Sequence, residues 1–161
     1  MVVINLSTAR LLEVASKLPE PLVVPPDVVR ETATEGERLG YADAGLIRKA
    51  LREGWIRVAE EVDERIVRRL QQENRLRRAD AAVLAVSLKM RAVVGSDDGK
   101  VRRVAELEGI AFGGTGYLLG RLIATGRLTR QQAKDRLDAM IEAGWYCDVE
   151  TYGRLLRNLG L

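Results

Sequence analysis

The stretch "AVVGSDDGK" at residues 92–100 begins as a β-branched apolar run and ends in two adjacent carboxylates, Asp97 and Asp98. The apolar part predicts a buried strand, because β-branched side chains fit a pleated, half-buried surface. Acids at the end of such a strand have three uses that the residues alone leave open. They could cap a helix, contact a phosphoryl group or hold a metal ion.

The rest of the chain alternates short β-branched runs with longer stretches of helical spacing. This alternation, without hairpin turns, predicts an α/β fold with a mostly parallel sheet between helices. Residues 79–90 are apolar nearly all round, as in a buried helix, and Pro26 is placed to open another. We expect about five strands, at "VVIN" (2–5), "LVVP" (22–25), "WIRV" (55–58), "AVVGS" (92–96) and "IAFG" (110–113).

The chain of 161 residues shows no repeat or linker, which predicts a single domain. Its α/β core is expected at about 1–114, followed by a helical segment at about 115–161 in which Thr129 caps the middle helix. One cysteine, Cys147, excludes an intramolecular disulfide. No apolar run approaches the roughly 20 residues of a membrane span, and no secretion signal is visible. We therefore expect a cytoplasmic protein without a membrane partner.

The sequence contains no histidine, which excludes histidine-based catalysis and the common zinc sites. A catalytic metal would need oxygen ligands, which favours Mg²⁺ or Mn²⁺. The formal net charge is only +3, but "RIVRRLQQENRLRR" (65–78) holds six arginines. Arginine matches phosphate geometry, so this run is either a nucleic-acid contact or a solvated surface.

Polar side chains fall where a parallel sheet binds ligands, beyond the carboxyl ends of its strands. Asn5 ends the first predicted strand, Glu31 follows the second, and Asp80 opens the apolar helix. Taken singly, these acids could each stabilise a helix end or face solvent. Taken together, Glu31, Asp80 and Asp98 could converge on a divalent ion, with the Ser96 hydroxyl beside it.

The order of these motifs resembles the PIN-domain family, the ribonuclease fold of VapC-type toxins. "AMIEAGWYCDVETYGRLLRNLG" (139–160) resembles the ends of a poorly characterised prokaryotic branch with extra C-terminal helices. In the family, the first strand ends in an aspartate followed by Thr or Ser, and Asn5 and Ser7 in "VVINLST" occupy these positions. The family's second acid is matched by Glu31 in "VVPPDVVRE", and its third by Asp80 in "RADAAVLAVS". The last motif is matched by Ser96 and Asp98 in "VVGSDDGKVRRVAELEG".

The resemblance implies a three-layer α/β/α sandwich and a metal-dependent endoribonuclease that cuts RNA with Mg²⁺ or Mn²⁺. Asp80 and Asp98 would be the principal metal ligands, and Glu31 would position an ion or orient the attacking water. The further residues implied are Asn5 and Asp97 as additional ligands, Ser7 and Ser96 in support, and Arg77 and Arg78 on RNA phosphates. A small antitoxin and a homodimer are the partners that the toxin-like members suggest.

Asn5 departs from the family, because an aspartate usually stands there. The amide removes a negative charge, so the alternative is a weakened PIN fold that serves as an RNA- or protein-binding module.

Two other classes fit less well. "GIAFGGTGYLLG" (109–120) has the glycines of a dinucleotide site but lacks a following strand with a ribose-binding acid. The glycines are better explained by a tight turn and close helix packing. A receiver domain would need an acid pair at the first strand and a lysine ending a later one, and neither is present.

Overall fold

The strands of the protein form two separate parallel pairs. The computed structural model describes residues 2–161. Strand β1 (Val23–Val24) pairs with β2 (Arg57–Val58), and β3 (Val94–Gly95) pairs with β4 (Phe112–Gly113). These four lie inside four of the five predicted runs, and both pairs are parallel as predicted. The α/β class is therefore correct, whereas the single sheet of about five strands is not formed across residues 2–161.

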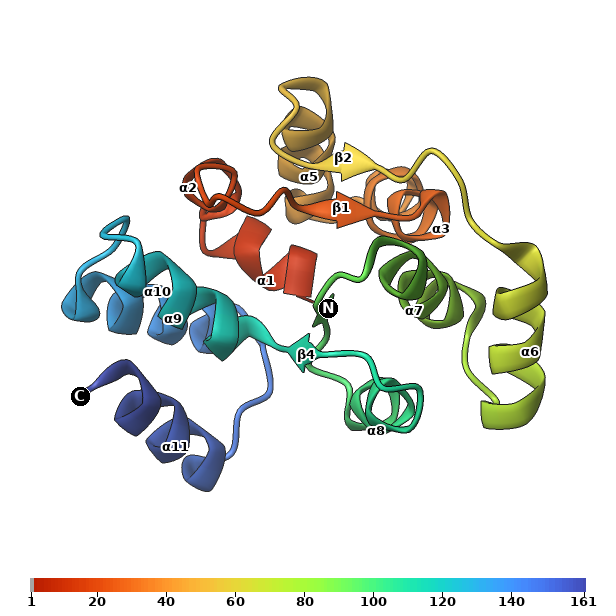
Figure 1. Ribbon diagram of the computed structural model, residues 1–161. Helices are drawn as coiled ribbons and strands as arrows, with labels where there is room; N and C mark the ends of the chain where they lie inside the picture. Colours follow the sequence, from red (N-terminus) through yellow and green to blue (C-terminus); the bar gives the residue numbers. More distant parts are fainter. Residues whose placement is uncertain (1) are drawn as a thin grey trace.

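The missing strand is the first one, because Val2–Thr8 is helix α1. The β-branched residues there predicted a strand, but tertiary packing overrides so weak a preference. Val2 and Leu6, four residues apart, are both buried on one side of α1. Figure 1 shows the N-terminal end of α1 between the levels of the two strand pairs. Asn5 consequently lies on a helix and ends no strand.

Most of the molecule is helical, and the predicted helix at residues 79–90 is confirmed. Residues 79–90 form most of α7, and Pro26 occupies the first turn of α3. The helix that α3 begins widens into a π-helical turn, η1, and then resumes as α4. After α1, the helices of the first two thirds are α2 (Leu12–Ala15), α3 (Pro26–Val29), η1 (Arg30–Thr34), α4 (Glu35–Arg38), α5 (Ala42–Arg52), α6 (Glu64–Asn74), α7 (Arg78–Met90) and α8 (Gly99–Leu107).

The segment after residue 115 consists of three helices, as predicted. They are α9 (Thr115–Ala124), α10 (Arg130–Glu142) and α11 (Val149–Leu159). Thr129 caps α10, since its hydroxyl oxygen accepts from the Gln132 backbone N–H. The Gln132 side chain in turn accepts from the Thr129 backbone N–H, which completes a capping box. Gly116 lets α11 approach α9, because a Cβ there would overlap the side chain of Leu155. One of the glycines in the 109–120 stretch thus serves close helix packing, as expected.

Two hydrophobic clusters hold these elements together. The first joins α1, α2 and α5 to the C-terminal helices, around Leu6, Leu11, Ile47, Leu119 and Leu137. The second joins α6, α7, α8 and β3, around Val67, Leu70, Leu84, Val94 and Val101. Across residues 2–161, no helix is both long and apolar enough to cross a membrane. Asp80, Asp97 and Asp98 lie near the ends of α7, β3 and α8, which belong to the second cluster, whereas Glu31 lies in η1.

Candidate acidic site

Asp97, two residues after β3, is the most heavily bonded acid of the predicted set. Its Oδ1 accepts from the Thr115 backbone N–H at 2.8 Å and from Arg102 Nη2 at 3.1 Å. Its Oδ2 accepts from Thr115 Oγ1 at 2.6 Å and from Asn5 Nδ2 at 3.1 Å. Four donors therefore share this carboxylate, whose side chain is only 13% exposed. Asp97 ties α1, α8 and α9 to the end of β3.

A glycine makes room for this cluster. Gly114 precedes α9, and a Cβ at this position would overlap both Arg102 Nη2 and Asp97 Oδ1. Arg102 also donates through Nε to the Ser96 carbonyl at 2.6 Å. The backbone at residue 114 must therefore come as close to the cluster as only a glycine allows.

Asp98 caps helix α8. Its Oδ1 accepts from the backbone N–H groups of Lys100 and Val101, at 2.8 and 3.1 Å. The predicted Ser96 lies beside it, since Ser96 Oγ accepts from the Asp98 backbone N–H at 3.1 Å. The helix-cap use that the sequence left open is thus present. Both bonds use Oδ1, so Oδ2 has no hydrogen-bond partner within residues 2–161.

Asp80 and Glu31 are less constrained. Asp80 lies in the first turn of α7, where the positive end of the helix dipole favours an anion. Its Oδ2 has one long contact, 3.4 Å to Arg77 Nε, and its side chain is 27% exposed. Glu31 is exposed and lies in the π-helical turn η1. π-Helical turns occur often at functional sites.

Contacts between elements place the segments that contain these acids next to one another. Lys100 Nζ donates to the Arg75 carbonyl at 2.8 Å, so the start of α8 lies against the loop that leads into α7. Asp98 and Asp80 thus lie on neighbouring segments. Helix α3, which leads into the turn carrying Glu31, packs against α7. Within residues 2–161, however, no three acids or cysteines gather closely enough to form a metal-binding group.

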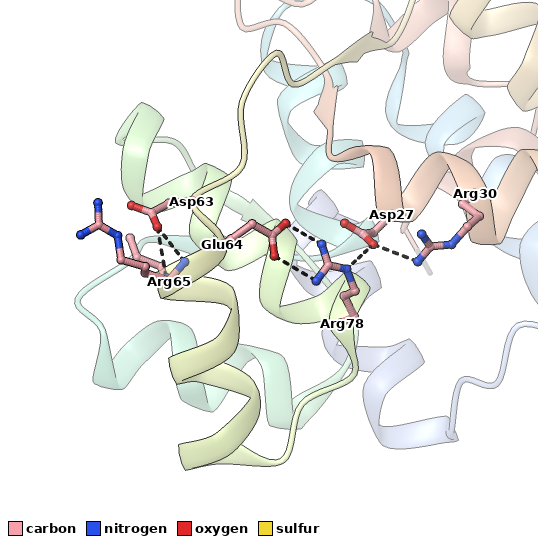
Figure 2. Close-up of polar contacts among 7 residues, drawn as sticks. Asp27, Arg30, Asp63, Glu64, Arg65 and Arg78 are labelled. Carbon is pink, nitrogen blue, oxygen red and sulfur yellow. Dashed lines mark hydrogen bonds and ion pairs between the residues drawn. The ribbon is translucent and has the colours of Figure 1, made fainter.

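The two arginines predicted to hold phosphate differ in their surroundings. Arg77 is 75% exposed, and its one ionic contact within residues 2–161 is the loose contact to Asp80. Arg78 uses all three guanidinium nitrogens on two carboxylates, Asp27 and Glu64 (Figure 2). Ser7, the remaining predicted residue, is buried and donates to the Asp43 carbonyl of α5 at 3.1 Å. Its hydroxyl therefore bonds to α5, and it makes no hydrogen bond to Asp97 within residues 2–161.

The C-terminal loop also reaches this region. Burial raises the pKa of the Cys147 thiol, and the negative charges of Asp148 and Asp97 raise it further. Cys147 thus lies within electrostatic range of the Asp97 carboxylate.

The family model of the PIN domain matches residues 1–161. The chain belongs to the PIN-domain family. Comparisons with curated proteins and with solved structures give no match. PIN domains are generally nucleases that depend on divalent metals such as Mg²⁺, and they generally bind RNA.

The donor chemistry of this PIN domain suits such an ion. Mg²⁺ prefers oxygen ligands and is usually held by one or two carboxylates, with waters and substrate phosphates completing its shell. Asp80 and Asp98 each have one carboxylate oxygen without a hydrogen-bond partner within residues 2–161. Because no three acids or cysteines gather into a metal-binding group within residues 2–161, the protein alone supplies an incomplete shell. An ion here would depend on RNA phosphate and water for its other ligands.

Sequence reasoning missed several residues that shape the site. Asp27 is 5% exposed and pairs with two arginines, and a single acid within the apolar run "VVPPDVV" was the available signal. Thr115 and Arg102 gave no such signal, because their role depends on the distance to Asp97 in the folded chain.

Proposed function

We propose that this PIN domain is a Mg²⁺- or Mn²⁺-dependent endoribonuclease, in which Asp80 and Asp98 are the metal ligands. The observation that supports this most directly is their placement at the N-terminal ends of neighbouring helices, each with an oxygen free of hydrogen bonds. A bound ion would lower the pKa of a water molecule and stabilise charge on the phosphodiester. Glu31 would orient that water, and exposed Arg77 would contact an adjacent phosphate.

Other predicted residues take supporting roles in this proposal. Asp97 has its lone pairs committed to donors, so it fixes the end of β3 on which Asp98 is carried. Asn5 directs its amide nitrogen at Asp97 and thereby holds the same strand end. Ser96 supports Asp98 through the backbone bond described above. The toxin role, with a small antitoxin and a homodimer as partners in the cytoplasm, is proposed from the family resemblance.

A second function follows from a different observation. Because no three acids gather within residues 2–161, the chain could instead bind RNA without cutting it. This is the weakened binding module to which Asn5 already points. The two functions share RNA binding and differ in metal-dependent hydrolysis.

The experiment is cleavage of a panel of labelled RNAs with Mn²⁺, Mg²⁺ or EDTA, scored also for gel retardation. Asp80→Asn is the test variant, and Asp135→Asn is the control because Asp135 is an exposed acid on α10. Metal-dependent cleavage that Asp80→Asn abolishes and Asp135→Asn preserves supports the nuclease. Retardation without cleavage supports the binding module, and cleavage that survives Asp80→Asn contradicts the assigned site.

A further inference from the structure

Arg78, the first residue of α7, is the centre of an ion cluster that joins three helices. Its Nε donates to Asp27 Oδ1 at 2.8 Å, and its Nη1 and Nη2 donate to Glu64 at 3.1 and 2.6 Å. Asp27 also accepts from Arg30 Nη2 at 2.9 Å. Figure 2 shows the guanidinium between the two carboxylates, with α3 on one side and α6 on the other. We call these contacts the Arg78 clasp.

The charges of the clasp reinforce one another. The hydrogen bond from Arg78 lowers the pKa of Glu64, and the bonds to Glu64 and Asp27 raise the pKa of Arg78 above its already high value. Asp27 is almost fully buried, and a buried carboxylate is costly unless it is paired and hydrogen-bonded. Arg78 is therefore needed by Asp27 and is not free to serve as a phosphate ligand.

The clasp lies next to both less constrained acids. Asp27 precedes Glu31 by four residues, so the two share one face of the helix that runs from α3 into η1. Arg78 precedes Asp80 by two residues in the first turn of α7. The bond from Arg78 to Asp27 thus fixes the helix that carries Glu31 against the helix that carries Asp80. It does so immediately before the π-helical turn that contains Glu31.

We propose that Arg78 is a positioning residue, whose clasp sets the place of Glu31 relative to Asp80. This inference rests on the proposed function, because it assigns the two acids to one site. A positioning role differs from phosphate binding in what it predicts. Loss of a phosphate contact weakens RNA binding, whereas loss of alignment lowers the rate of the bound complex and the metal affinity.

The chain offers a matched control. Arg69 on α6 makes a similar two-pronged bond to Glu108 at 2.8 and 2.7 Å, with Glu73 as a further partner at 3.1 Å. The side chains of Arg69 and Arg78 are both 41% exposed. The Arg69 contacts join α6 to the far end of α8 and involve none of the predicted site acids. An equal substitution at Arg69 therefore reports what the loss of such a bond does to stability alone.

The test compares Arg78→Lys with Arg69→Lys, since lysine keeps the charge but loses the two-pronged geometry. For Arg78→Lys we expect about tenfold weaker Mn²⁺ binding by calorimetry and about tenfold lower kcat, with KM for RNA within about twofold of wild type. We also expect faster hydrogen exchange of the backbone at 30–34. Arg69→Lys should keep Mn²⁺ affinity, kcat and that exchange rate close to wild type.

Several results would overturn the inference. Unchanged Mn²⁺ affinity and kcat in Arg78→Lys would do so, as would equal losses in both variants. A raised KM with kcat unchanged would return Arg78 to phosphate binding. If Arg78→Lys fails to fold, Glu64→Gln tests the same clasp from its exposed partner.

The failure of the proposed function is distinguishable from the failure of the clasp. A wild-type protein that neither binds Mn²⁺ nor cuts RNA refutes the nuclease, while the exchange measurement still tests the clasp. In that case faster exchange at 30–34 in Arg78→Lys alone supports the positioning of Glu31, and unchanged exchange overturns it.

Discussion

An aspartate lies at the end of β3 and another at the start of α7, and the two differ in how many hydrogen bonds they accept. Asp97 at the end of β3 accepts from four donors on three other elements. Asp80 at the start of α7 has one contact of 3.4 Å. A carboxylate whose lone pairs are used holds the structure together, whereas one with free lone pairs remains available to a ligand. Hydrogen bonding in the folded chain therefore separates structural acids from candidate catalytic ones.

The largest expected effect is the loss of Asp97. Asp97→Ala removes an acceptor shared by Thr115, Arg102 and Asn5 in a partly buried cluster, and we expect the free energy of unfolding to fall by about 2–4 kcal/mol. Asp80→Ala removes one long contact and should change stability by less than about 1 kcal/mol. Urea denaturation of both variants measures the difference. Equal losses would break the distinction between the two acids.

Asn5→Asp is the next largest change, because it places a second carboxyl about 3.1 Å from Asp97. Two like charges so close raise the pKa of the introduced carboxyl, and we expect a destabilisation of about 1–3 kcal/mol at pH 7. A carboxyl whose pKa is raised in the folded state keeps a proton at a pH where the same carboxyl in the unfolded state has lost it. The destabilisation should therefore shrink as the pH falls from 7 towards 5.

Asn5→Ala is the control for this pH dependence, because it loses the hydrogen bond without adding a charge. The loss in free energy of unfolding caused by Asn5→Ala should stay nearly constant between pH 7 and 5. If the two variants lose stability with the same pH profile, repulsion at Asp97 is not the cause.

Gly114→Ala tests how tightly the Asp97 cluster is packed. The added methyl group overlaps Arg102 and Asp97, so the backbone or the cluster must shift, at a cost of about 1–3 kcal/mol. Gly120→Ala, within α9, has nothing within 4 Å of the new Cβ and should stabilise the helix by about 0.5–1 kcal/mol. Thermal unfolding of the two variants should give shifts of opposite sign. A neutral Gly114→Ala would show that the cluster is loose.

How far the sequence predicts this molecule depends on the distance over which each residue acts. Thr129 and Pro26 were correctly placed because a cap and a first-turn proline depend on a few neighbouring residues. Residues 2–5 were wrongly predicted as a strand, since their β-branched composition was outweighed by packing against distant helices. The role of Asp97 depends on Thr115 and Asn5, which lie 18 and 92 positions away along the chain. Spacing within a motif carries no information about such contacts.

Asp98 both caps a helix and has an oxygen without a hydrogen-bond partner within residues 2–161. Its substitution by asparagine is expected to have the smallest effect on stability of those considered. Asp98→Asn keeps the acceptor that caps α8, so stability should fall by about 0.5 kcal/mol or less, whereas Asp98→Ala should cost about 1 kcal/mol. The asparagine variant nevertheless removes the charge that a metal ion would need. We expect Asp98→Asn to fold normally and to lose Mn²⁺-dependent cleavage, measured beside Asp80→Asn on the same RNA. Cleavage that survives in Asp98→Asn but not in Asp80→Asn would leave Asp98 as a helix cap alone, and the metal site would then rest on α7.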